Sequence, residues 1–113
     1  MPSTVFAVPI LPGKTDAWKQ AIAELTGARK DDYLKSRQRH GIHQETVALQ
    51  QTPHGDFAVV YMVADDLSQV MPNFASSSDP FDQWFAQTVL QGAHGMDLTQ
   101  LPPTNPVIID IVK

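Results

Sequence analysis

The sequence predicts an α+β fold made of two successive strand–helix–strand units. A His-Gly step occurs twice, at His40-Gly41 and at His94-Gly95, about half of the 113-residue chain apart. Each step follows a stretch with helical periodicity and precedes a stretch rich in β-prone residues. Glycine is the residue most often found just past a helix end, because it tolerates positive φ. The two steps therefore indicate the ends of two corresponding helices.

The first unit begins with a strand at Val5–Leu11, apolar on both faces, in which Pro9 should interrupt the pairing. A helix follows from Thr15 or Asp16, because one apolar stripe has helical spacing. We expect this helix to kink at Gly27 and to continue to the cationic residues that precede His40. The stripe consists of Trp18, Ala21, Ile22 and Leu25. A more polar strand is expected at His43–Thr52.

The second unit contains the strongest strand signal, Phe57–Ala64, which should pair with its predecessor in an antiparallel hairpin. A short helix is predicted at Gln69–Ala75. Asp79-Pro80 is the clearest helix start, an N-cap acid followed by proline at the first helical position. The helix should run over Asp79–Ala93, and a final strand is expected at Pro106–Val112.

This element order predicts a ferredoxin-like βαββαβ sandwich, with a four-stranded antiparallel sheet and both helices on one face. The strands are apolar on both faces, however, and no further segment is left to cover the second face. An exposed apolar patch of that size is rare in monomers. We therefore expect a homodimer that forms through the sheet face.

Composition narrows the function classes. The length is that of a single domain, 1–113, and the formal charge of −4 offers no basic field for nucleic acid or a membrane surface. The chain has no cysteine, and no histidine or carboxylate pair has the spacing of a metal site, so no metal and no cofactor are expected. No signal peptide or membrane span is evident, which predicts a soluble cytoplasmic protein.

The chain resembles the dimeric α+β barrel superfamily in element order, and one of its branches in three motifs. That branch is distantly similar to antibiotic-biosynthesis-type monooxygenases. The motifs are Arg39-His40-Gly41-Ile42 followed by Glu45, Gly55-Asp56, and Asp79-Pro80-Phe81-Asp82-Gln83-Trp84-Phe85. The resemblance implies a sheet-to-sheet homodimer and a ligand between the helices and the sheet.

We predict a small-molecule site in which His94 or His40 is the proton acceptor and Tyr61 orients an oxygen atom. Each histidine has the alternative role of capping a helix end. The predicted ligand-binding residues are three aromatic side chains that would hold a ring and two arginines that would receive an anionic group. They are Phe81, Trp84, Phe85, Arg37 and Arg39. An aromatic stripe at helical spacing is more often an ordinary core.

The leading functional hypothesis is a protein that binds a small apolar or aromatic ligand. The enzymatic alternative is a cofactor-independent monooxygenase or isomerase that acts on a small aromatic compound. A third hypothesis is haem binding through His94 with Trp84 nearby, although the first strand lacks the asparagine that haem-degrading relatives use there. The remaining alternative is a structural dimer whose pocket is filled by side chains.

Overall fold

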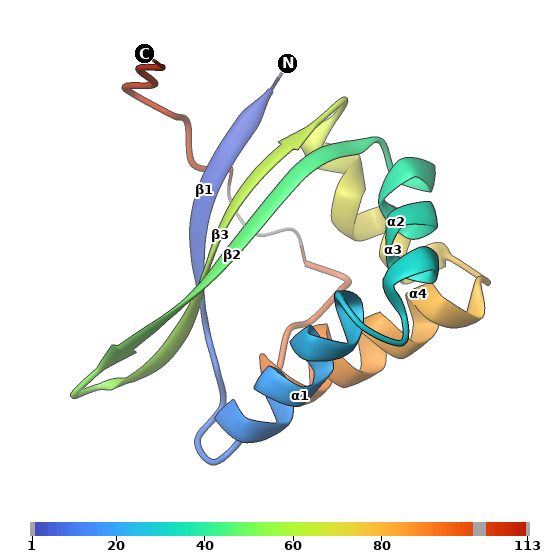
Figure 1. The fold of residues 1–113 in the computed structure, drawn as a ribbon. Coiled ribbons are helices and arrows are strands. Elements are labelled where there is room, and N and C mark those ends of the chain that lie inside the picture. The colour runs from blue at the N-terminus through green and yellow to red at the C-terminus, as the bar shows by residue number, and fades with distance from the viewer. Residues whose placement is uncertain (1, 101–103, 113) are drawn as a thin grey trace.

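The computed structural model describes residues 2–100 and 104–112. Its three strands form one antiparallel sheet in the order β1-β3-β2, which confirms the α+β class. The helices all pack on the same face of that sheet (Figure 1). The strands are β1 (Ser3–Pro9), β2 (Ile42–Thr52) and β3 (Gly55–Ala64). The helices are α1 (Thr15–Leu25), α2 (Lys30–Arg39), α3 (Val70–Ser76) and α4 (Pro80–Phe85), with a 3-10 turn η1 (Leu67–Gln69) and a π-helical segment η2 (Ala86–Ala93) that continues α4.

The central strand is β3, the segment with the strongest strand signal. Its side chains alternate between the two faces of the sheet, and those toward the helices are the more deeply buried. Val60 lies opposite Phe6 of β1 and Val47 of β2. The predicted hairpin of β2 and β3 is confirmed, with a register irregularity between Ile42 and Gln44.

The predicted fourth strand at Pro106–Val112 is not formed. Pro106 makes a single antiparallel bridge to Thr4 at the edge of β1, and the chain then leaves the sheet. Proline has no N–H to donate to a ladder, and the side chains that follow find no layer to pack against. Ile108 is 85% exposed and Val112 is 89% exposed. The described sheet therefore has three strands, and a four-stranded ferredoxin-like sandwich is not confirmed.

The helix boundaries follow the predicted signals with one difference. The long helix predicted before His40 is two helices, because short-range bonds from the N–H groups of Thr26 and Gly27 to Ala23 and Glu24 end α1. Gly41 and Gly95 have φ of 68° and 64°, so both end their helices in the left-handed conformation as predicted. The Asp79 N-cap is also confirmed. Its carboxylate accepts hydrogen bonds from the N–H groups of Phe81 at 2.9 Å and Asp82 at 3.2 Å.

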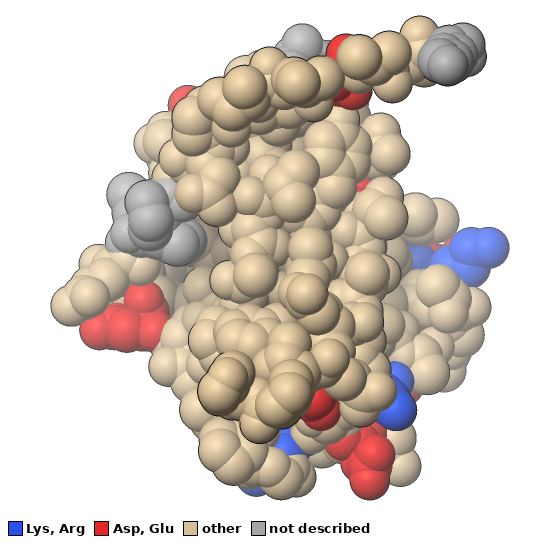
Figure 2. Space-filling model, turned by 90° about the vertical axis from the view of Figure 1, so that its left-hand side faces the viewer, with Lys and Arg blue, Asp and Glu red and all other residues tan. Residues whose placement is uncertain are grey.

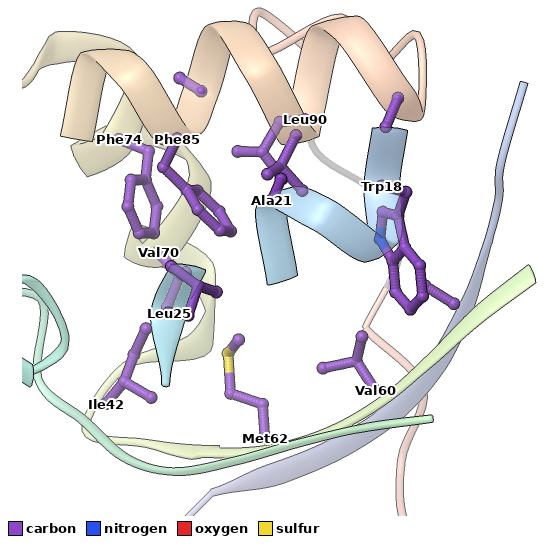
Figure 3. Packing of buried hydrophobic residues seen from close by; sticks show 14 of the residues in the cluster. Trp18, Ala21, Leu25, Ile42, Val60, Met62, Val70, Phe74, Phe85 and Leu90 are labelled. Carbon is purple, nitrogen blue, oxygen red and sulfur yellow. The ribbon is translucent and has the colours of Figure 1, made fainter. Parts of the chain in front are cut away.

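The hydrophobic core lies between the sheet and the helix layer (Figure 3). Val60 and Met62 project from β3, while Trp18 and Leu90 approach them from α1 and η2. Among the described residues, no helix combines the length and apolar character needed to cross a bilayer. A cytoplasmic location stays a prediction.

The opposite face of the sheet, which we call the outer face, is covered by none of the described helices (Figure 1). The strand positions that point to it carry no charged side chain. Figure 2 shows this side of the molecule, whose middle part is free of Lys, Arg, Asp and Glu. The outer-face positions include Val5, Ala7, Gln44, Thr46, Ala48, Gln50, Phe57, Val59, Tyr61 and Val63.

Candidate functional site

A mainly apolar cavity lies between the helix layer and the sheet. Its walls include Phe6 and Val8 of β1, Val60 and Met62 of β3, and Trp18 of α1. Further walls come from the other helices, with Val70, Met71, Phe74, Phe85, Val89 and Leu90. The sheet and the helices meet here through apolar side chains because each element presents one apolar face to the other.

The cavity has a volume of about 60 Å³ accessible to the centres of water molecules. A single water needs roughly 10–15 Å³ of such volume, so the space holds a few waters or part of a small organic molecule. A ligand of ordinary metabolite size fits only if neighbouring space becomes continuous with the cavity.

His94 is a polar group in the cavity wall, at the end of η2. Its Nδ1 lies 2.9 Å from the carbonyl oxygen of Pro9, and a carbonyl only accepts, so Nδ1 carries the proton. Burial lowers the pKa of His94 below its ordinary value of 6.5, and the Pro9 bond opposes this only in part. The ring is therefore neutral at pH 7, with Nε2 as a hydrogen-bond acceptor or base.

Trp18 contributes an unpaired donor to the same wall. The side chain is 5% exposed and extends from α1 toward the sheet (Figure 3). Its buried Nε1–H finds no acceptor among the described residues. An unsatisfied buried donor costs about 1–3 kcal/mol, so a ligand oxygen or a water that reached this N–H would be held there.

Arg37 and Glu45 form the charged part of the cavity wall. The guanidinium Nε donates to Glu45 Oε1 at 2.9 Å, and the two side chains are 7% and 11% exposed. The hydroxyl of Tyr33 also donates to Glu45. Burial and the neighbouring negative charge of Glu45 raise the pKa of Tyr33, against the opposing effect of Arg37. Tyr33 therefore stays protonated and supports the Glu45 carboxylate.

A second polar cluster surrounds Asp82 of α4, which is fully buried. Its carboxylate accepts hydrogen bonds from Ser36 at 2.5 Å and Ser77 at 2.7 Å, and His40 Nε2 lies 2.9 Å away. Arg39 adds two contacts, at 3.1 and 3.3 Å. Burial alone would raise the pKa of Asp82, but these bonds lower it to about 2. The cluster connects α2 to α4 and leaves no oxygen of Asp82 free to act on a ligand.

Three of the predicted site residues line the cavity: His94, Phe85 and Arg37. Phe81 and Trp84 do not. Their rings pack together with centroids 5.6 Å apart, and the guanidinium of Arg29 covers the Trp84 ring at 4.0 Å. Trp84 therefore lies outside the cavity, beneath the Arg29 side chain.

Three further predicted residues also lie elsewhere. His40 and Arg39 are bound to Asp82, outside the cavity wall. Tyr61 lies on the central strand as expected, but its register places it between Val5 and Thr46 on the outer face. Its neighbours Val60 and Met62 face the cavity, and side chains alternate along a strand. In this subunit Tyr61 is thus on the opposite side of the sheet from His94.

Trp18 and Glu45 are cavity residues that the sequence reasoning did not select. The helical spacing of Trp18 is equally that of a core residue, and only its unpaired N–H distinguishes it. Glu45 could have been selected from the sequence, because it is a carboxylate in a strand segment that also contains Val47 and Leu49. A charge at an inward strand position must be paired.

The residues present do not fit haem. A porphyrin needs far more room beside His94 than a cavity of about 60 Å³ offers. One ring nitrogen of His94 is hydrogen-bonded to Pro9, as is common in metal-ligating histidines. The first strand, however, provides only the apolar side chains of Phe6 and Val8 toward this space. Over residues 2–100 and 104–112, no group of three or more His, Cys, Asp or Glu is arranged to hold a metal ion.

The comparison with known families gives a single finding. Residues 1–101 match the model of DUF6176, described as a family of unknown function. No match is found among the curated proteins.

Proposed function

The chain belongs to the DUF6176 family, and we propose that this member binds a small, mainly apolar molecule between its helices and its sheet. The observation that carries the proposal is a cavity with apolar walls and a neutral histidine of defined tautomer. A partly buried imidazole nitrogen that only accepts is suited to an acidic O–H of a ligand, such as a phenol.

The enzymatic form of this proposal makes His94 the base that removes a phenolic proton before oxygenation or isomerisation. Proton transfer needs an acceptor within hydrogen-bond reach whose pKa is near the working pH. The neutral Nε2 supports such a role. The Pro9 carbonyl holds the ring in the tautomer that the step requires.

The proposal is tested with phenol and its methyl ether, anisole, which has no donor. We expect phenol to bind about tenfold more tightly, corresponding to about 1.4 kcal/mol for one buried hydrogen bond. His94→Leu should remove this preference. His54→Leu, in the exposed turn between β2 and β3, should retain it.

The measurement is calorimetric titration at pH 7 and below 6.5. The preference for phenol should decrease at acidic pH, because protonation of Nε2 removes the acceptor. Equal binding of phenol and anisole by the unchanged protein would show that His94 is not the acceptor. Absence of binding by both probes would contradict the cavity proposal.

We further propose that two copies associate through the outer face. Its uncharged strand positions and the exposed apolar residues of 108–112 support this, because a monomer would leave both in water. Light scattering should give twice the chain mass, and Val59→Lys at the centre of the face should give one chain mass. Gln20→Lys, on the exposed side of α1, is the control. A monomeric unchanged protein at micromolar concentration would contradict this proposal.

A further inference from the structure

The Arg37–Glu45 pair separates the cavity from a second hollow. Both residues line the cavity, and both also line an open cleft of about 430 Å³ between α2 and the beginning of β2. The cleft wall also includes Tyr33, Gln38 and His43. The ion pair is therefore the partition between an interior space and a space open to water.

Arg37 is the fixed member of the pair. The carbon of its guanidinium lies 4.6, 5.0 and 4.4 Å from the ring centroids of Tyr33, Phe74 and Phe85. Its Nη1 donates to Ser36 at 3.3 Å, and the residue is 6% exposed. Rings and hydrogen bonds from α2, α3 and α4 hold this cation in place.

Glu45 is the member with fewer contacts outside the pair. It lies on β2, an edge strand of the described sheet, and its hydrogen-bond partners there are Arg37 and Tyr33. A rotation of its side chain toward the cleft returns the carboxylate to water, because that space is already open, but it breaks the bonds to Arg37 and Tyr33. The same rotation joins the cavity to the cleft.

Rotation of Glu45 leaves the Arg37 charge facing an apolar cavity without a counter-ion, which is costly unless another anion replaces the carboxylate. A guanidinium binds a carboxylate in a two-point geometry. We infer that the ligand of this cavity is a small organic acid, whose carboxylate displaces Glu45 from Arg37 and whose apolar body occupies the cavity. This inference rests on the proposed binding function and specifies its ligand class.

The sheet register separates the two polar ends of the cavity wall. Glu45 lies opposite Met62, whereas Pro9, which holds His94, lies opposite Phe57. Five residues of β3 separate these positions, roughly 16 Å at about 3.3 Å per residue. Arg37 and His94 are therefore at opposite ends of the site. The carboxylate of a ligand would bind at one end and a hydroxyl group at the other.

The two tryptophans provide the experiment. The Trp18 side chain lines the cavity, and the Trp84 indole lies outside it beneath Arg29. In ¹H–¹⁵N spectra, hexanoate and benzoate should shift the Trp18 indole signal and leave that of Trp84 unchanged. Each acid should bind at least tenfold more tightly than its neutral amide, hexanamide or benzamide.

Two variants test the displacement itself. Glu45→Gln removes the competing charge, so carboxylate affinity should rise about tenfold while amide affinity stays the same. Arg37→Gln should abolish the preference for the acid. Asp32→Asn and Lys35→Gln, both exposed on α2, make the same charge changes away from the site and should alter neither affinity.

Equal shifts of Trp18 by acids and amides would overturn the anion inference and leave the proposed binding function intact. An unchanged carboxylate affinity in Glu45→Gln would also overturn the anion inference. This comparison with the unchanged protein can be made even if Arg37→Gln does not fold. No response of Trp18 to any of the four probes would contradict the proposed function as well.

Discussion

Two neighbouring residues of α2 belong to polar clusters of opposite character. Ser36 contacts Asp82 of α4, whose carboxylate is fully buried and receives bonds from four side chains on α2, at its C-terminal end and in the segment between α3 and α4. Arg37 contacts Glu45, whose carboxylate has two side-chain partners and lies beside two hollows. The first cluster is saturated and enclosed, whereas the second is adjacent to open space.

This difference separates a structural charge from a charge available for binding. A buried carboxylate with every oxygen satisfied cannot exchange a partner without losing several bonds. A carboxylate with fewer partners and an open space on one side loses fewer bonds when it exchanges a partner. Both clusters contain an arginine of α2 that binds a carboxylate, so the residue types alone do not separate them.

The largest effect should come from Asp82→Asn. The amide keeps the shape, but it removes the charge that His40 and Arg39 face and directs donors at other donors. We expect the free energy of unfolding to fall by about 3–5 kcal/mol, as when one member of a buried ion pair is removed. Urea unfolding at a fixed protein concentration measures this.

Ser77→Ala is the matched control for Asp82→Asn, because it removes one of the bonds to the same carboxylate. We expect a loss of about 1 kcal/mol, the usual net value of a single hydrogen bond. Equal losses for the two variants would show that Asp82 is not the centre of the cluster, and the contrast with Glu45 would no longer hold.

A smaller effect should appear in acid. Burial would raise the pKa of Asp82, but its hydrogen bonds hold it at about 2, below the ordinary 3.8. A group with a lowered pKa in the folded state stabilises the fold above its unfolded pKa and loses that contribution as the pH falls. About 2 kcal/mol should therefore disappear between about pH 4 and pH 2.

His94 should add a separate loss at higher pH. Burial lowers its pKa, partly offset by the Pro9 bond, so stability should begin to fall as the pH drops below about 6.5. Urea midpoints at a series of pH values distinguish the two groups. Asp82→Asn should flatten the curve only below pH 4, and His94→Leu only above it. A variant that left its own window unchanged would refute the corresponding assignment.

The helix and strand framework was largely readable from local patterns. The alternation of Phe57–Ala64 predicted the central strand, and Asp79-Pro80 predicted the start of α4. The π-helical geometry of η2 was not readable, since no composition signal marks a shift from i−4 to i−5 bonding. The β-prone segment 106–112 failed as a strand for the opposite reason, because its composition was correct but no packed layer receives it.

The sequence by itself determined the α+β class, the hairpin, the two helix ends at Gly41 and Gly95, and the absence of cysteine chemistry. These depend on local periodicity and on the backbone preferences of single residues. Only the tertiary structure decided that His94 and Arg37 share a cavity while His40 and Arg39 serve Asp82. The physical reason is that burial and pairing are set by residues distant in sequence, so two arginines only two positions apart acquire different roles.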